Sequence, residues 1–193
     1  MTVRCRVIVT VALLLTLDVL SARTKQAGEL IERTLAIVAG QALTLSEVRA
    51  AVTLGLVNGV DSPVDIAGAT PRLVDRMLML REVQRYAPPE PQEGEVERQL
   101  AAVRARFPTA DLYARVLQSG GFSEARLRAW IRDDLRVAAY LAQRFAAVAA
   151  PADPGAGDTA TDRAVAERQA ALIADWLDDL RRRTPIVELW KTP

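Results

Sequence analysis

The stretch Thr34-Leu-Ala-Ile-Val-Ala-Gly-Gln-Ala-Leu-Thr-Leu-Ser-Glu47 decides how this chain begins to fold. Its first six residues predict a short strand, residues 40–41 a turn, and residues 42–44 a brief return strand. Thr44 and Glu47 have the spacing of a capping box, in which the threonine hydroxyl caps the backbone and the glutamate reaches back. The pattern therefore predicts a hairpin that leads directly into a helix, which should end near Leu56.

Helical patterns dominate the chain after this hairpin. Thr70 and Pro71 indicate a helix start, because threonine caps the backbone and proline fits the first helical position, so residues 61–69 are predicted to be a loop. This helix should end at Pro88-Pro89. Residues 150–161 are rich in proline and glycine and are predicted to be a flexible linker. Apolar residues at helical spacing predict further helices at residues 92–106, 110–118, 124–149 and 162–183.

A second strand-like segment, Ile186-Val-Glu-Leu-Trp190, lies at the other end of the chain. Neither this segment nor the hairpin can be stable alone, since an isolated hairpin is marginal in water. We therefore expect the C-terminal segment to pair with Leu35–Val38. The predicted fold is mainly α, with a small β pairing of the N- and C-terminal strands.

The composition excludes several classes of function. The sequence holds 25 Lys and Arg against 24 Asp and Glu, a net charge of +1, so no global field draws nucleic acid or anionic lipid to the protein. It contains no histidine, which excludes Ser-His and Cys-His catalysis and histidine-based metal sites. Its one cysteine, Cys5, lies in a candidate targeting segment. We predict no catalytic residue, no metal and no cofactor.

Residues 1–22 have the pattern of a secretory signal peptide. Arg4 and Arg6 precede an apolar run from Val7 to Leu17, and small residues follow at Ser21 and Ala22. The run is shorter than the roughly 20 apolar residues that span a bilayer. An uncleaved anchor is the alternative. With cleavage near Ala22 we expect an exported protein that is not inserted in a membrane.

Four segments of the sequence, taken in their order along the chain, carry a resemblance to a known family. They are Leu35 to Glu47 in the opening stretch; Leu73-Val-Asp-Arg-Met-Leu-Met-Leu-Arg-Glu82; Gln118-Ser-Gly-Gly-Phe-Ser-Glu124 with Leu127-Arg-Ala-Trp-Ile-Arg-Asp-Asp-Leu135; and Trp176-Leu-Asp-Asp-Leu-Arg181 with Ile186-Val-Glu-Leu189. They resemble the opening strand and helix start, the next helix, the turn and long helix, and the terminal helix and strand of SurA-type periplasmic chaperones. The resemblance implies a helical SurA N-terminal-like domain over residues 23–149, with residues 162–193 completing the same domain.

The same resemblance implies a function and one departure from the family. Family members act as ATP-independent holdases in the periplasm, where they bind unfolded or outer-membrane protein segments. They usually carry parvulin-type prolyl isomerase domains before the terminal helix, whereas this chain has only residues 150–161 there. Parvulin sites also typically rely on histidines. We therefore expect a periplasmic chaperone without prolyl isomerase activity.

Nine residues are the candidate peptide-binding set. Two methionines suit varied partners because their side chains are adaptable. The others are aromatic or aliphatic residues that flank the Gly120-Gly121 turn or lie on the predicted 124–149 helix. Large apolar surfaces left uncovered are where partners bind. The nine residues are Met77, Met79, Tyr113, Phe122, Leu127, Trp130, Ile131, Leu135 and Tyr140.

A structural explanation stands beside each of these candidates. The residues of the 124–149 helix could simply pack the core, and Tyr113 and Phe122 could hold the turn against neighbouring helices. Met77 and Met79 point about 200° apart on a helix, so one could be core and one surface. The alternative functions are an assembly subunit with one fixed partner and, least expected, an isomerase. An open groove between helices 70–87 and 124–149, rather than one filled by the C-terminal helix, would favour the holdase.

Overall fold

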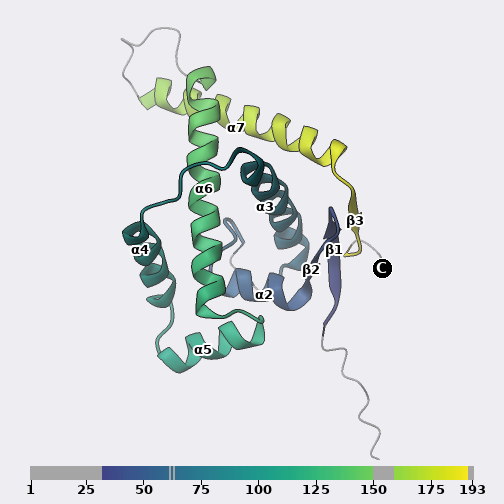
Figure 1. Cartoon of the computed structure of the whole chain (residues 1–193), viewed down its shortest axis with the longest axis vertical. Coiled ribbons are helices and arrows are strands. Elements are labelled where there is room, and N and C mark those ends of the chain that lie inside the picture. Colours follow the sequence, from purple (N-terminus) through teal and green to yellow (C-terminus); the bar gives the residue numbers. More distant parts are fainter. Residues whose placement is uncertain (1–31, 61, 63, 150–158, 191–193) are drawn as a thin grey trace, which may run out of the picture. The chain divides into compact units, whose positions relative to one another are not determined.

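The computed structural model describes residues 32–60, 62, 64–149 and 159–190 (Figure 1). The predicted signal peptide and residues 150–158 of the predicted linker lie outside the described residues. The elements in chain order are β1 (Thr34–Val38), β2 (Gln41–Thr44), α2 (Leu45–Thr53), α3 (Ile66–Tyr86), α4 (Glu93–Arg104), α5 (Ala110–Ser119), α6 (Glu124–Ala149), α7 (Thr159–Arg183) and β3 (Ile186–Glu188). The protein is mainly helical with a small antiparallel sheet, which confirms the predicted fold class.

The sheet joins the two ends of the described chain. Its strand order is β2-β1-β3, and β3 lies antiparallel to β1 with Ile37 opposite Val187. The Ala39 N–H donates to the carbonyl of Pro185 at 2.9 Å, and the Leu189 N–H donates to the carbonyl of Leu35 at 2.8 Å. The predicted pairing of the C-terminal segment with Leu35–Val38 is therefore confirmed.

A tight turn closes the hairpin of β1 and β2. Val38 pairs with Gln41, so only Ala39 and Gly40 form the loop, and both have positive φ, 50° and 87°. These angles are those of a type I′ turn, whose twist matches the twist of the strands. Glycine adopts positive φ without strain, whereas alanine does so at a cost.

The first helix begins as the sequence predicts, but its glutamate has a different partner. The Thr44 hydroxyl accepts the Glu47 N–H at 3.4 Å, as in a capping box. The Glu47 carboxylate instead binds Arg126 of α6, at 2.5 Å. The helix ends at Thr53, before the predicted end near Leu56.

The start of α3 differs from the prediction. The helix begins at Ile66 because the Asp65 carboxylate caps it, accepting the Gly68 N–H at 2.8 Å. The prediction of a loop through residue 69 and of a start at Thr70 was wrong. Pro71 lies in the second turn, where its missing N–H forfeits only the bond to a carbonyl of the first turn. The Thr70 hydroxyl, expected to be the cap, donates to the Ile66 carbonyl at 2.7 Å.

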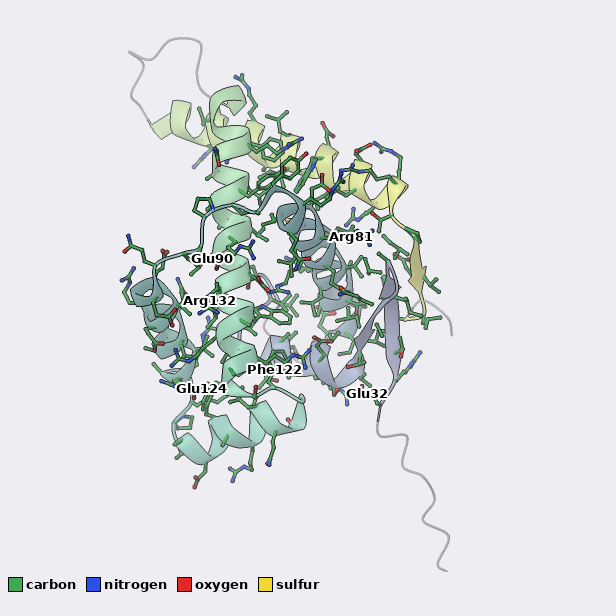
Figure 2. All side chains as sticks on the ribbon, viewed as in Figure 1. Glu32, Arg81, Glu90, Phe122, Glu124 and Arg132 are labelled. Atoms are coloured by element: carbon green, nitrogen blue, oxygen red, sulfur yellow. The ribbon has the colours of Figure 1, made fainter. Side chains whose placement is uncertain are left out.

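The core lies among stacked layers, which Figure 1 shows in the order α4, α6, α3 and sheet. α6 packs against α4, α3 and α7, while α3 also contacts β1 and α2. Ion pairs reinforce the α4–α6 boundary. Arg132 of α6 lies 4.0 Å from Glu90, just before α4 (Figure 2). Arg132 also lies 3.1 Å from Glu93, and Arg128 pairs with Glu97. The largest enclosed apolar side chains include Leu35, Leu54, Leu78, Leu100 and Leu127.

α7 packs across α3 and α6. Trp176 and Leu180 of α7 are buried, and the Trp176 ring lies 6.0 Å from the ring of Tyr140 on α6. Arg181 pairs with Asp75 of α3 at 2.6 Å, and Arg183 pairs with Glu82 at 3.3 Å. Because β3 follows directly after α7, these contacts hold the terminal strand next to β1.

Candidate functional site

Most of the nine candidate residues belong to the core. Six of the nine are buried: Leu127 has no exposed surface, and each of the other five exposes 9% or less of its surface. The six buried residues are Tyr113, Phe122, Leu127, Trp130, Ile131 and Tyr140. Packing accounts for the four on α6, because its apolar face is covered by α3, α4 and α7. It accounts for the other two as well, since the Tyr113 ring lies 5.6 Å from the Phe107 ring and the Phe122 ring lies 5.5 Å from the Trp130 ring. The remaining three, Met77, Met79 and Leu135, are half-buried.

The candidates do not share one groove. α3 and α6 pack directly against each other, and α7 contacts both. Met79 lines a hollow of about 380 Å³ beside α7, and Ile131 and Leu135 line another of about 350 Å³ beside α4. Met77 and Trp130 meet in a third and larger concavity. The sequence left open whether a groove between residues 70–87 and 124–149 is open or filled by the C-terminal helix. Of the three concavities, the third brings candidates from both helices together.

This concavity, which we call the hairpin cleft, has a volume of about 730 Å³. It lies between the β1–β2 hairpin, α3 and the first half of α6. Its apolar lining comes from all three elements and includes Leu43, Leu73, Met77, Leu80, Ala129 and Trp130. The volume lies in the range of about 300–1,000 Å³ that is usual for ligand pockets.

The hairpin cleft also borders an edge of the sheet, β2, with which no further strand of the described residues pairs. β2 has β1 on one side only, and Gln41, Ala42 and Leu43 of β2 line the cleft. A two-residue turn makes Val38 and Gln41 a hydrogen-bonded pair, so the backbone groups of Ala42, one residue on, point away from β1. An edge with outward N–H and C=O groups is a template for another extended chain.

Two of the three arginines in the cleft are held by partners. Arg76 lies with its guanidinium carbon 3.6 Å from the centroid of the Trp130 ring and its Nε 2.6 Å from Asp134. Arg126 pairs with Glu47 and lies 4.6 Å from the centroid of the Phe122 ring. These contacts leave little of either charge for a ligand.

The third arginine, Arg81 of α3, differs from the other two. It is exposed, and it forms no ion pair or hydrogen bond with any residue in the described ranges. Gln84, one turn further along α3, is likewise exposed and lines the same cleft. Figure 2 labels Arg81 on α3, on the side of the helix where the sheet lies. The cleft thus combines an apolar interior with one unpaired cation.

The adjacent carboxyls of α6 have perturbed pKa values. Burial raises the pKa of Asp133, opposed by the nearby guanidinium groups of Arg76 and Arg136. Burial also raises the pKa of Asp134, opposed by Arg76. Neighbouring residues on a helix point about 100° apart, so the two carboxyls do not converge on one ligand. Within the described residues, no three His, Cys, Asp or Glu side chains come together as a metal site.

Comparison with protein-family models and with curated proteins returned no match for this chain. The similarity to SurA-type chaperones therefore rests on the four sequence segments alone. None of the helices in the described part of the chain has the length and hydropathy needed to span a membrane.

Proposed function

We propose that this protein is an ATP-independent periplasmic chaperone that holds extended segments of unfolded polypeptides in the hairpin cleft. The observation that carries the proposal is the meeting of a free strand edge with an apolar cleft. The edge offers main-chain hydrogen bonds, which any sequence can make except at proline. The cleft offers the half-buried Met77 and Leu80 and the exposed Ala129 for the side chains of the bound segment.

The size of the site agrees with weak, tolerant binding. β2 has four residues, so at about 3.3 Å per residue it can pair with only a short extended segment. Methionine adapts to differently shaped side chains, and flexible apolar surfaces bind many partners. A holdase needs this kind of contact because it must release its client without ATP. We infer that outer-membrane proteins in transit are the clients, in line with the resemblance described above.

An aggregation assay tests the proposal. The purified protein is mixed in several-fold molar excess with a chemically unfolded outer-membrane β-barrel protein, and light scattering is followed after dilution of the denaturant. We expect the protein to suppress the scattering. Unchanged scattering at that excess would contradict the holdase function.

A matched pair of variants connects this activity to the cleft. Ala129 and Ala139 are both exposed alanines of α6, but only Ala129 lines the hairpin cleft. Ala129→Trp should fill the cleft and reduce the suppression, whereas Ala139→Trp should act like the wild type. Circular dichroism melts of both variants show whether each is folded. Equal suppression by both folded variants would place client binding elsewhere.

An assembly subunit with one fixed partner is the second candidate. Val187 and Leu189 at the outer edge of the sheet expose 51% and 36% of their surfaces, which favours a partner at that edge. Cross-linking in intact cells separates the two functions. A holdase gives many cross-linked clients, whereas an assembly subunit gives a single partner in constant ratio.

A further inference from the structure

We propose that the hairpin cleft selects segments that carry a carboxylate, and that Arg81 is the residue that recognises it. This inference rests on the proposed function and deepens it by naming the chemical class of the bound segment. Arg81 lines the cleft from α3 and makes no ion pair or hydrogen bond with the described part of the chain.

The charges around the cleft favour an anion over a cation. Arg76 is paired with Asp134 and stacked on Trp130, and Arg126 is paired with Glu47. The acidic groups of the lining have partners as well: Glu47 binds Arg126, and Asp133 lies 3.7 Å from Arg136. A lysine or arginine of a client would meet carboxylates that are already paired. A carboxylate would meet a guanidinium that has no competing partner.

The neighbours of Arg81 define what should accompany the carboxylate. Gln84 lies one helical turn beyond Arg81, and its amide can donate a second hydrogen bond. Met77 lies one turn before Arg81, and Leu80 directly precedes it, so apolar surface adjoins the cation. The guanidinium fork of arginine fits a carboxylate with two parallel hydrogen bonds. The preferred segment is therefore extended and apolar and carries one carboxylate.

That carboxylate can come from an aspartate or glutamate side chain or from the C-terminus of a chain. Four fluorescein-labelled peptides of one apolar sequence separate these sources. The first is neutral, with an internal glutamine and an amidated C-terminus; the second replaces the glutamine by glutamate; the third keeps the glutamine but has a free C-terminus; the fourth replaces the glutamine by lysine. Binding to the protein expressed from its full sequence is measured by fluorescence anisotropy at low salt.

We expect one or both acidic peptides to bind about three-fold more tightly than the neutral peptide, the magnitude of an exposed ion pair. The preference should vanish in 1 M salt, where charges are screened within about 3 Å. It should also vanish in Arg81→Gln, remain in Arg81→Lys, and turn into a preference for the lysine peptide in Arg81→Glu. Arg98→Gln on α4 is the control, since Arg98 is also exposed, forms no ion pair with the described residues and lies outside the cleft.

The outcomes separate this inference from the proposed function. Equal binding of the acidic and neutral peptides by the wild type would overturn carboxylate selection and leave the holdase intact. An acid preference that survives in Arg81→Gln would overturn the role of Arg81. Failure of the wild type to bind any of the four peptides would overturn both proposals. Arg81 is exposed, and circular dichroism of each variant shows that a lost preference is not lost folding.

Discussion

Arg76 of α3 lies flat against Trp130 of α6, with the guanidinium carbon 3.6 Å from the ring centroid. The same guanidinium donates to the Trp130 carbonyl at 3.2 Å and to the Asp134 carboxylate at 2.6 Å. The arginine thus joins two helices and fixes the position of the indole that lines the hairpin cleft. Stability of the fold and shape of the candidate site depend on the same contact.

Arg76→Lys should lower the free energy of unfolding by about 1 kcal/mol, because an ammonium group keeps the charge but loses the planar stacking and the fork of donors. Arg76→Gln should cost about 2 kcal/mol, since it also leaves the half-buried Asp134 carboxylate without a cation. Urea unfolding followed by tryptophan fluorescence measures both changes.

Arg85→Lys is the control. Arg85 is exposed, and among the described residues it pairs only with Glu82 of its own helix, at 3.4 Å. Its replacement should therefore leave the free energy of unfolding unchanged. A stability of Arg76→Lys equal to that of the control would show that the stacking contributes nothing.

The hairpin turn offers a stabilising substitution. Ala39 has a φ of 50°, and asparagine followed by glycine is the preferred pair for a type I′ turn. Ala39→Asn should therefore raise the free energy of unfolding by about 0.5–1 kcal/mol. The comparison is Ala42→Asn in the adjacent strand, where asparagine is disfavoured and should give no gain. Thermal melts measure the stability of both variants. An equal gain in stability at both positions would show that the turn is not its cause.

The closing strand provides a test of the sheet. Val187 of β3 lies opposite Ile37 of β1. Backbone hydrogen bonds two residues to either side, from Leu189 to Leu35 and from Ala39 to Pro185, make Val187 and Ile37 a hydrogen-bonded pair. Val187→Pro removes the N–H of that pair and should lower the free energy of unfolding by about 1–2 kcal/mol. Val187→Thr keeps the N–H and the branched side chain and should change stability little. If proline is tolerated as well as threonine in urea unfolding, β3 does not contribute to the stability of the domain.

The sequence predicted the elements whose signals are local. The hairpin at residues 34–44 and the long helix from Glu124 were both predicted, because the threonine cap and the apolar spacing are local signals. The turn itself was placed one residue too late, at residues 40–41, whereas the structure has it at Ala39 and Gly40. The closing strand was also correct, since an unpaired strand needs a partner and only one other β segment was available. The start of α3 was missed because Thr70-Pro71 is a common start signal, whereas Asp65 caps one turn earlier.

The candidate site was predicted only in part, because its character depends on long-range contacts. The predicted set includes Met77 and Trp130, which line the hairpin cleft, but also Leu127, which is fully enclosed by helices distant in sequence. Arg81 was not chosen, since nothing in the sequence distinguishes it from the other arginines of the chain. Among the described arginines that line the cleft, Arg81 alone lacks a partner. That contrast depends on long-range contacts, such as the pairing of Arg126 with Glu47, 79 positions away.

Two carboxyl groups, those of Asp75 and Glu32, should make the free energy of unfolding depend on pH in opposite directions. Burial raises the pKa of Asp75 above its ordinary value of 3.8, although Arg181 opposes the shift, so the folded state holds that proton more tightly than the unfolded state does. The stabilising contribution of Asp75 is therefore complete below pH 3.8 and is lost as the pH rises through the raised pKa. A hydrogen bond from Ser46 lowers the pKa of Glu32 below 4.5, so its contribution is present above pH 4.5 and is lost as the pH falls.

Urea unfolding of the wild type, Asp75→Asn and Glu32→Gln at a series of pH values from 4 to 7 measures both contributions. The free-energy difference between wild type and Asp75→Asn should fall as the pH rises, whereas the difference between wild type and Glu32→Gln should rise. Arg181→Gln removes the cation that opposes burial, so in its background the decline at Asp75 should move to higher pH. A difference at Asp75 that grows with pH would mean that the attraction of Arg181 outweighs burial, and that the ion pair between α3 and α7 stabilises the domain more than its buried position indicates.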